Sequence, residues 1–506
     1  MKDSITQSMD WLHTWGGLLS GWLLFAIFLT GTLTVFEEEI TYWMQPELHP
    51  LPISSPRLEA VTDQLSRLAP KADWWRIELP SDRMPIAEIW WQYQGQRVHR
   101  ILHPATGDVV VSRDTRGGDF FYRFHYHLLL DRLGIWIVGA AAMAMLTALV
   151  TGLVIHHRIF KDFFTFRPQA ASHRAWLDAH NVTSVLVLPF HLMITFTGLV
   201  IMWSIYMPAG LQLVYGGDVN QFWADIESRT PRGPSQQAAP LVSLADLERR
   251  ARPYWQGGQT KRIFVRHPGD RHATVEISRR SDDRLALVHD RVSFDGVTGE
   301  ILDVQTTYGP AFLTQTVLSG LHFVQFGGPP MRWLYFLMGL AASAMIATGL
   351  VLWIIKRRER QAHSSPALSF HLVEALNVSA VAGLLVATGV FFWVNRLLPV
   401  ELEQRALWEL RCFFIAWTLC AIHSFMRLNS VDAWKEQLTI CALLFGFLPL
   451  LNAMTTGTNL MASIPHGLWS VAGIDLTALA MGVLLGWTAW SLGKCSSHHI
   501  AALRSI

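Results

Sequence analysis

Eight apolar runs, each about 20 residues long, dominate the sequence, and each is long enough to cross a bilayer as a helix. Only 16% of the residues are charged, against roughly 25% in an average soluble protein. The chain is therefore predicted to be an α-helical polytopic membrane protein. The predicted spans lie near residues 11–36, 133–156, 181–205, 332–355, 371–394, 407–426, 437–456 and 467–492.

Short basic stretches between the apolar runs predict the orientation of the chain. They contain Arg158, Lys161, Arg167 and Arg174, then Lys356, Arg357, Arg358 and Arg360, and finally Arg427 and Lys435. The positive-inside rule places them in the cytoplasm, so both termini are expected there and residues 37–132 and 206–331 outside. The first apolar run is too long for a signal peptide and is expected to be retained. A net charge of +2 gives no indication of nucleic-acid binding.

The two outer segments have the same pattern of polar and apolar residues. Each contains one helical stretch, at 56–69 or 243–253, followed by several strand-like runs. Each ends in a Thr-Gly-Asp/Glu turn, at residues 106–108 and 298–300, where glycine supplies the positive φ of a tight turn. Two small α+β units are therefore predicted.

Histidine and glycine recur at fixed spacings across the apolar runs. His13 and Gly31 are 18 residues apart, as are His180 and Gly198. The spacing of 27 residues from His125 to Gly152 recurs between His322 and Gly349. The first four spans are thus predicted to be an internal parallel duplication, with a pseudo-twofold axis along the membrane normal. A third copy, from His371 to Gly389, begins a section of four helices without an outer domain.

The histidines are candidate ligands of a cofactor, because ionisable residues in or beside membrane spans are costly and usually functional. Neutral imidazole is a good axial ligand of haem iron. His180, His191 and Gly198 share one face of the third run, where glycine leaves room for a flat macrocycle or a close helix. The alternative for each histidine is an interfacial side chain that reaches toward water or caps a helix.

Several other chemistries have no motif in the sequence. No G-x-G-x-x-G opens a helix after a strand, and neither a P-loop nor an H-E-x-x-H is found. The chain is therefore not expected to bind NAD(P)H or a nucleotide, and electrons would come from a separate cytoplasmic or quinone-pool donor.

Several motifs resemble the PepSY-associated transmembrane family of bacterial inner-membrane proteins. They are LHTWGGLLSGWLLFAIFLTGTLTVFEEEI, the two Thr-Gly turns, LHFVQFGG and TGLVLWIIKRR. That family includes PiuB-like iron-regulated proteins and ferric-siderophore reductases of the FoxB and FpvG type. The resemblance covers about residues 8–360, and residues 366–506 have no counterpart in the shorter members.

The resemblance implies at least two b-type haems and reduction of siderophore-bound Fe(III) in the periplasm. The implied haem-iron ligands are His13, His125, His180 and His322, with His191 and His371 as further positions. The implied organisation is a first helix at 1–36, PepSY-like domains at 37–132 and 206–331, helices at 133–205 and 332–360, and a C-terminal section at 361–506.

The glycines at positions 31, 152, 198 and 349 are expected to make room for the haem macrocycles. A bulky ferric chelate needs an outer docking site, and the clustered Trp74, Trp75, Trp90 and Trp91 are the candidates; the alternative is that they pack the domain against the bilayer. A second function also fits PepSY domains, namely a non-enzymatic sensor or peptidase-regulating membrane protein.

Overall fold

The computed structural model describes residues 2–51, 57–103, 106–155, 172–226, 232–360 and 368–504. Arg158, Lys161 and Arg167 of the predicted basic loop lie outside this part of the chain. Two compact units are present. One contains Met1–Pro46, Arg113–Phe196 and Trp333–Ile506, and the other contains Glu47–Ser112 and Thr197–Arg332.

The first unit is helical, and two of its helices, α8 and α14, continue into the second unit. Its helices are α1 (Lys2–Thr34), α2 (Glu37–Met44), α4 (Asp119–His127), α5 (Asp131–Ile155), α7 (Ser172–Leu186), α8 (Leu188–Ile201), α14 (Gly328–Arg360), α15 (Leu368–Val378), α16 (Leu384–Leu397), α17 (Arg405–Met426), α18 (Ser430–Gly446), α19 (Leu448–Thr456), α20 (Leu460–Ser463) and α21 (Trp469–Arg504). A π-helical stretch at Ser379–Gly383 joins α15 to α16.

Seven helices in the described residues are long and apolar enough to span a membrane, which confirms seven of the predicted spans. The third predicted span is different, because α7 and α8 meet at a bend of 62°. The bend falls immediately before Pro189, which has no N–H to donate to the preceding turn and whose ring crowds that turn. The count becomes eight if the bent pair is one span.

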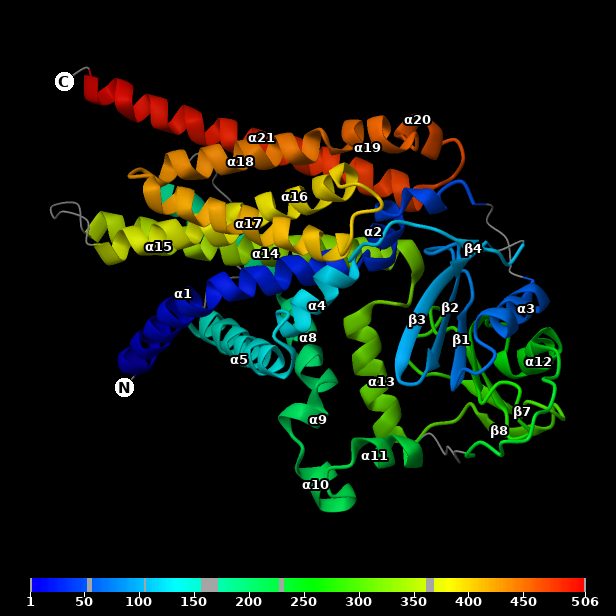
Figure 1. Cartoon of the computed structure of the whole chain (residues 1–506). Coiled ribbons are helices and arrows are strands. Elements are labelled where there is room, and N and C mark those ends of the chain that lie inside the picture. Colours follow the sequence, from blue (N-terminus) through cyan, green and yellow to red (C-terminus); the bar gives the residue numbers. More distant parts are fainter. Residues whose placement is uncertain are drawn as a thin grey trace. The chain divides into compact units, whose positions relative to one another are not determined.

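Helix α1 is antiparallel to both α5 and α14 in the helical unit. Along α14 the contacts run from Trp15 against Trp353 to Phe36 against Trp333, with ring centroids 5.9 and 4.9 Å apart. The C-terminal section also contacts α1, since the indole of Trp22 donates to the side-chain oxygen of Asn377 over 2.7 Å. Within that section α18 and α21 lie side by side (Figure 1).

The second unit is built on one antiparallel sheet of eight strands. Its order is β4-β3-β2-β1-β5-β6-β7-β8. The strands are β1 (Trp74–Glu78), β2 (Ala87–Tyr93), β3 (Gln96–Leu102), β4 (Val109–Val110), β5 (Thr260–Arg266), β6 (Thr274–Arg279), β7 (Arg291–Asp295) and β8 (Ile301–Gln305). The remaining helices of this unit are α3 (Leu58–Leu68), α9 (Trp203–Tyr206), α10 (Ala209–Tyr215), α11 (Val219–Ile226), α12 (Leu244–Ala251) and α13 (Pro310–Phe323), with short 3-10 turns at Pro46–Leu48 and Arg252–Trp255.

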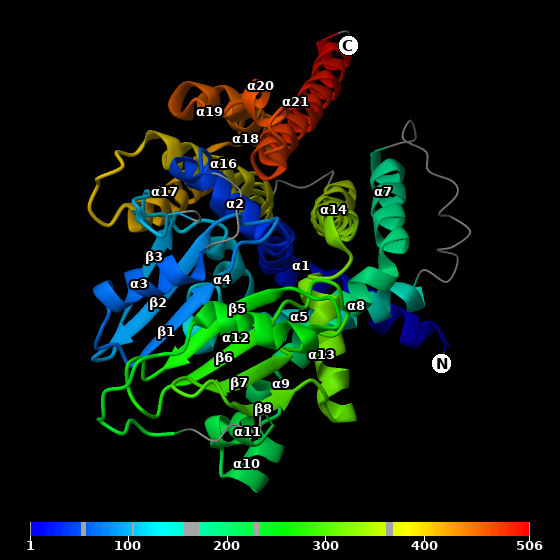
Figure 2. The same ribbon diagram turned by 90° about the vertical axis from the view of Figure 1, so that its right-hand side faces the viewer.

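The sheet contains both outer segments, each as a helix followed by a meander of four strands. The predicted units are therefore joined, because β1 pairs with β5 from Trp74 opposite Arg266 to Glu78 opposite Arg262. Helices α3 and α12 lie along one face of the sheet (Figure 2). Their leucines form a single core with alternate strand residues. The other face is lined by the polar and aromatic side chains of the same strands. Gly107 and Gly299 have φ of +77° and +72°, as the two Thr-Gly turns predicted.

Candidate functional site

In the first repeat, each histidine lies against the glycine of the neighbouring helix. His13 on α1 meets Gly152 on α5, where an added Cβ would lie 3.2 Å from the ring. His125 on α4 meets Gly31 on α1, where a Cβ would lie only 2.6 Å from Nδ1. The contact is therefore reciprocal between α1 and the consecutive helices α4 and α5, and it explains the fixed spacing of histidine and glycine along both segments.

The second repeat has the same reciprocal contacts. A Cβ on Gly349 would lie 3.1 Å from the ring of His180. A Cβ on Gly198 would lie 3.0 Å from the ring of His322. We call each of these four arrangements, an imidazole seated on a helix glycine, a His–Gly socket. Each glycine thus accommodates an imidazole, where the sequence led us to expect a macrocycle directly against it.

A hydrogen bond fixes the ring in every socket. The Nδ1 atoms of His13, His125 and His180 lie 2.8–2.9 Å from the carbonyl oxygens of Ala148, Ile27 and Met345, each four residues before the socket glycine. A carbonyl oxygen can only accept, so Nδ1 carries the proton in these three rings. In the neutral ring Nε2 then has the lone pair, and Nε2 is the atom that would bind a metal.

The threonine before the socket glycine contacts the ring Nδ1 in three of the four sockets, and in two of these the contact is additional to the carbonyl bond. Thr151 Oγ1 lies 3.3 Å from Nδ1 of His13, and Thr348 Oγ1 lies 3.2 Å from Nδ1 of His180. In the Gly198–His322 socket, Thr197 Oγ1 is 3.1 Å from Nδ1 of His322. The Thr-Gly dipeptide was visible in the sequence, but its role as a support for a histidine on another helix was not predicted.

His191 is a fifth histidine with a different environment. It is fully buried in α8, one turn after the bend, and neither ring nitrogen has a hydrogen-bond partner. Its ring is packed edge-on against Phe28 of α1, with centroids 6.4 Å apart. A buried imidazole with both nitrogens unsatisfied is unusual in a folded protein and is consistent with a group that is bound in the functional state.

The third copy does not form a His–Gly socket. His371 is half-buried, and its Nε2 atom is 3.1 Å from the carbonyl oxygen of Phe425. A Cβ on Gly389 would meet Leu444 instead of a histidine. His371 therefore resembles a helix-end residue more than the four socket histidines.

Comparison with protein families matches most of the chain to one family. The family described as PepSY-associated TM region matches residues 11–356. The chain belongs to this family. The match covers both helix–sheet–helix repeats and ends within α14, so the C-terminal helices α15–α21 lie beyond it.

One curated relative of this PepSY-associated protein matches over most of its length. It is described as uncharacterized protein PA4219, from Pseudomonas aeruginosa. The two are 25% identical over 400 residues, which is 75% of this chain and 96% of the relative. The relative therefore supports a shared architecture.

The four candidate docking tryptophans lie on opposite faces of the sheet. Trp75 and Trp91 are 3% and 9% exposed and belong to the core under α3 and α12, so they cannot form a docking surface. Trp74 and Trp90 point to the other face, where Trp74 stacks on Phe264. Alternation of side chains along a strand puts neighbouring tryptophans on opposite faces, but only the structure shows which face is covered by helices.

The C-terminal section contributes a buried polar network that was not predicted. Asp475 of α21 accepts hydrogen bonds from the Trp43 indole and the Asn452 amide, each over 2.9 Å. Arg396 of α16 lies over the Trp43 ring, 3.7 Å from its centroid, and donates to Asn452. These contacts attach α2 to the C-terminal helices. In the sequence, the network could have been suspected from Arg396 and Asp475, which are single charged residues within apolar runs.

Proposed function

We propose that this chain is a transmembrane haem oxidoreductase of the bacterial inner membrane. It passes electrons from a cytoplasmic or quinone-pool donor to a ferric siderophore in the periplasm and releases Fe(II). Both termini are cytoplasmic in this proposal, and the sheet unit is periplasmic.

The observation that carries the proposal is the fourfold repetition of the His–Gly socket. Structural histidines at membrane interfaces have no need of a glycine opposite the ring or of a carbonyl acceptor for Nδ1. Histidines that ligate metals commonly donate their second ring N–H to a carbonyl or carboxylate, which fixes the tautomer and raises the basicity of the ligating nitrogen. Three of the four sockets have this carbonyl contact, and the fourth has a threonine hydroxyl.

The residues fit haem better than a bare metal ion. Among the described residues no three His, Cys, Asp or Glu side chains gather as a metal-ion site. A porphyrin supplies four iron ligands itself, so two imidazoles complete the coordination. His13, His125, His180 and His322 provide ligands for two haems, and the unsatisfied nitrogens of His191 offer a further ligand or an exchange partner.

Bound haem would supply reversible one-electron chemistry at each site. The protein's own contribution is to hold each imidazole in one orientation before the cofactor binds. The glycine allows close approach, the carbonyl keeps the proton on Nδ1, and the apolar helices keep water away from the ring. The second half of the reaction concerns the substrate: siderophores hold Fe(III) through hard oxygen donors, so its reduction by one electron weakens binding and frees the metal.

Two measurements on the purified full chain test the proposal. A Soret band with low-spin character and a haem-to-protein ratio of two or more is expected. The chemically reduced protein, mixed anaerobically with a ferric siderophore, should reoxidise while Fe(II) appears in a chelator assay. Haems that stay reduced against hydroxamate, catecholate and mixed-ligand ferric siderophores would contradict the reductase function.

The second candidate is a non-enzymatic sensor or a regulator of a peptidase. It is favoured by the polar and aromatic side chains on the sheet face opposite α3 and α12, which could bind a ligand without redox chemistry. A colourless full-length protein, purified from haem-sufficient cells, would favour this candidate.

A further inference from the structure

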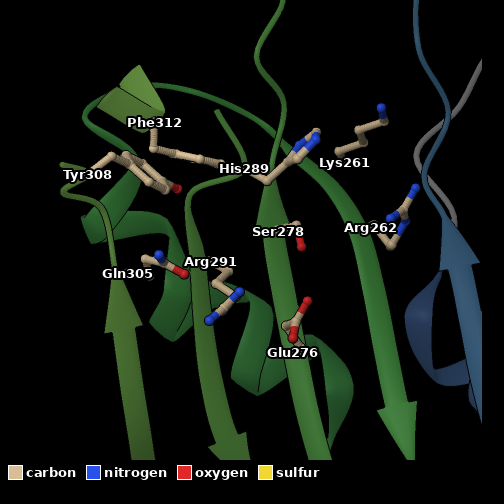
Figure 3. Close-up of a pocket in the computed structure, with 9 residues that line it drawn as sticks. All are labelled: Lys261, Arg262, Glu276, Ser278, His289, Arg291, Gln305, Tyr308 and Phe312. Atoms are coloured by element: carbon tan, nitrogen blue, oxygen red, sulfur yellow. The ribbon is translucent and has the colours of Figure 1, made fainter. Parts of the chain in front are cut away.

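A pocket lies on the face of the sheet opposite α3 and α12, over strands β5 to β8. Figure 3 shows that strand side chains form its floor, while Tyr308 and Phe312 close one side. The strand residues belong to the same face as Trp74, because Arg262 lies opposite Glu78 in the β1–β5 register. The pocket is therefore separated by the sheet from the core under α3 and α12.

Positive charge predominates among the lining residues. Lys261, Arg262 and Arg291 carry three cationic groups, while Glu276 is the single carboxylate in the lining. Arg262 already forms an ion pair with Glu78, and Arg291 is 3.8 Å from Asp303. Lys261 is half-buried in the lining, and a cleft lined mainly by one sign of charge attracts ligands of the opposite sign.

The remaining walls combine hydrogen-bonding groups with a flat apolar surface. Ser278 and Gln305 supply a hydroxyl and an amide to the floor. The rings of Tyr308 and Phe312 stack with centroids 5.4 Å apart and an angle of 29° between their planes. The cavity volume is about 170 Å³, smaller than the roughly 300–1,000 Å³ of pockets that enclose a whole drug-sized ligand. The pocket suits one arm or face of a larger ligand.

We propose that this pocket binds ferric chelates that carry net negative charge through free carboxylate or phenolate oxygens. The inference rests on the proposed function, because only a reductase of ferric chelates would need such a ligand at this sheet. Guanidinium and ammonium groups form short charge-assisted hydrogen bonds with these oxygens. The stacked rings give the planar part of the chelate an apolar surface, and the assignment replaces the tryptophan cluster as the docking site.

The test uses gallium(III) citrate, a redox-inert analogue of an anionic ferric chelate. Binding to the full chain in detergent is measured by calorimetry, so the result does not depend on electron transfer. Lys261→Gln should weaken binding roughly tenfold, equivalent to about 1.4 kcal/mol. Glu276→Gln should tighten binding, because it removes the one negative charge of the lining; a merely structural role of these residues cannot produce this opposite pair of effects.

Arg249→Gln is the matched control. It removes one positive charge from α12, on the far side of the sheet, where Arg249 is paired with Asp246 at 2.8 Å. Binding should be unchanged in this variant. Equal binding in wild type and Lys261→Gln would overturn the pocket assignment, even if ferric siderophores are reduced. Equal affinity for metal-free citrate, or for cationic gallium desferrioxamine B, would overturn the assignment to anionic chelates.

Discussion

The imidazole of His125 occupies the space into which any side chain at Gly31 would project. A Cβ at residue 31 would lie 2.6 Å from Nδ1, closer than real Cβ contacts allow, and the ring cannot move without losing its bond to the Ile27 carbonyl. Gly31→Ala should therefore displace the ring, destabilise the helix pair by about 1–3 kcal/mol and lower the haem content. The measurements are the haem-to-protein ratio and the thermal unfolding temperature.

Gly473→Ala is the control for this substitution. Gly473 is also in a long helix, and nothing lies within 4 Å of a Cβ built on it. The substitution should leave the haem content unchanged and stabilise α21 slightly, since alanine is a better helix former than glycine. Equal haem loss in both variants would show that the socket has no special role.

The histidines separate into those that should ligate haem and those that should not. His180→Ala removes an imidazole whose Nδ1 is bonded to the Met345 carbonyl, and one haem should be lost while another remains. His371→Ala removes a ring that contacts the Phe425 carbonyl through Nε2 and lies in no His–Gly socket, and the spectrum should be retained. The Soret absorbance per chain, measured in both variants, shows whether each histidine is needed for haem binding. Full haem content in alanine variants of all four socket histidines would refute the ligand assignment.

The buried carboxylate of Asp475 should matter for stability rather than for electron transfer. Asp475→Ala leaves the buried Trp43 indole without its acceptor and removes one of the two acceptors of the Asn452 amide, which also donates to the Thr458 carbonyl. Removing the acceptor of a buried donor costs about 1–3 kcal/mol. Thermal unfolding in detergent measures the loss, and Glu401→Ala, at an exposed position, should have little effect.

The pH dependence of stability should carry a contribution from His289 in the sheet. Desolvation of the imidazole by the surrounding protein, and then repulsion by the positive charges of Lys261 and Arg262, lower the pKa of His289 to about 4. The negative charges of Glu78 and Asp290 partly oppose this shift. Between about pH 6.5 and 4 the unfolded chain therefore binds a proton that the folded chain does not, so stability falls as the pH falls through this range. His289→Gln should lose less stability than wild type across this window. An unfolding-temperature difference that does not vary with pH would contradict the lowered pKa.

The orientation of the chain can be tested with reporters. A reporter fused after Arg504 should be active in the cytoplasm, and a reporter inserted next to Gly257 in the sheet unit should be active in the periplasm. The basic residues in the last turns of α14 and directly after α17 favour this orientation. A periplasmic signal from the C-terminal fusion would reverse the proposed direction of electron transfer.

The sequence predicted the elements of this protein well, because their signals are local. Long apolar runs, the two helix–meander patterns and the Thr-Gly turns each depend on neighbouring residues. The equal spacing from His13 to Gly31 and from His180 to Gly198 also indicated a duplication. The bend at Pro189 had a local signal that was outweighed by the continuous hydrophobicity of residues 181–205.

By itself, then, the sequence determined the membrane class, the repeats and the set of histidines. Only the tertiary structure decided that each histidine is paired with the glycine of a different helix, that β1 and β5 join the outer segments in one sheet, and that Trp75 and Trp91 face the core. The physical reason is that spacing along a chain fixes the face of a helix or strand, whereas the partner of that face depends on how distant segments pack.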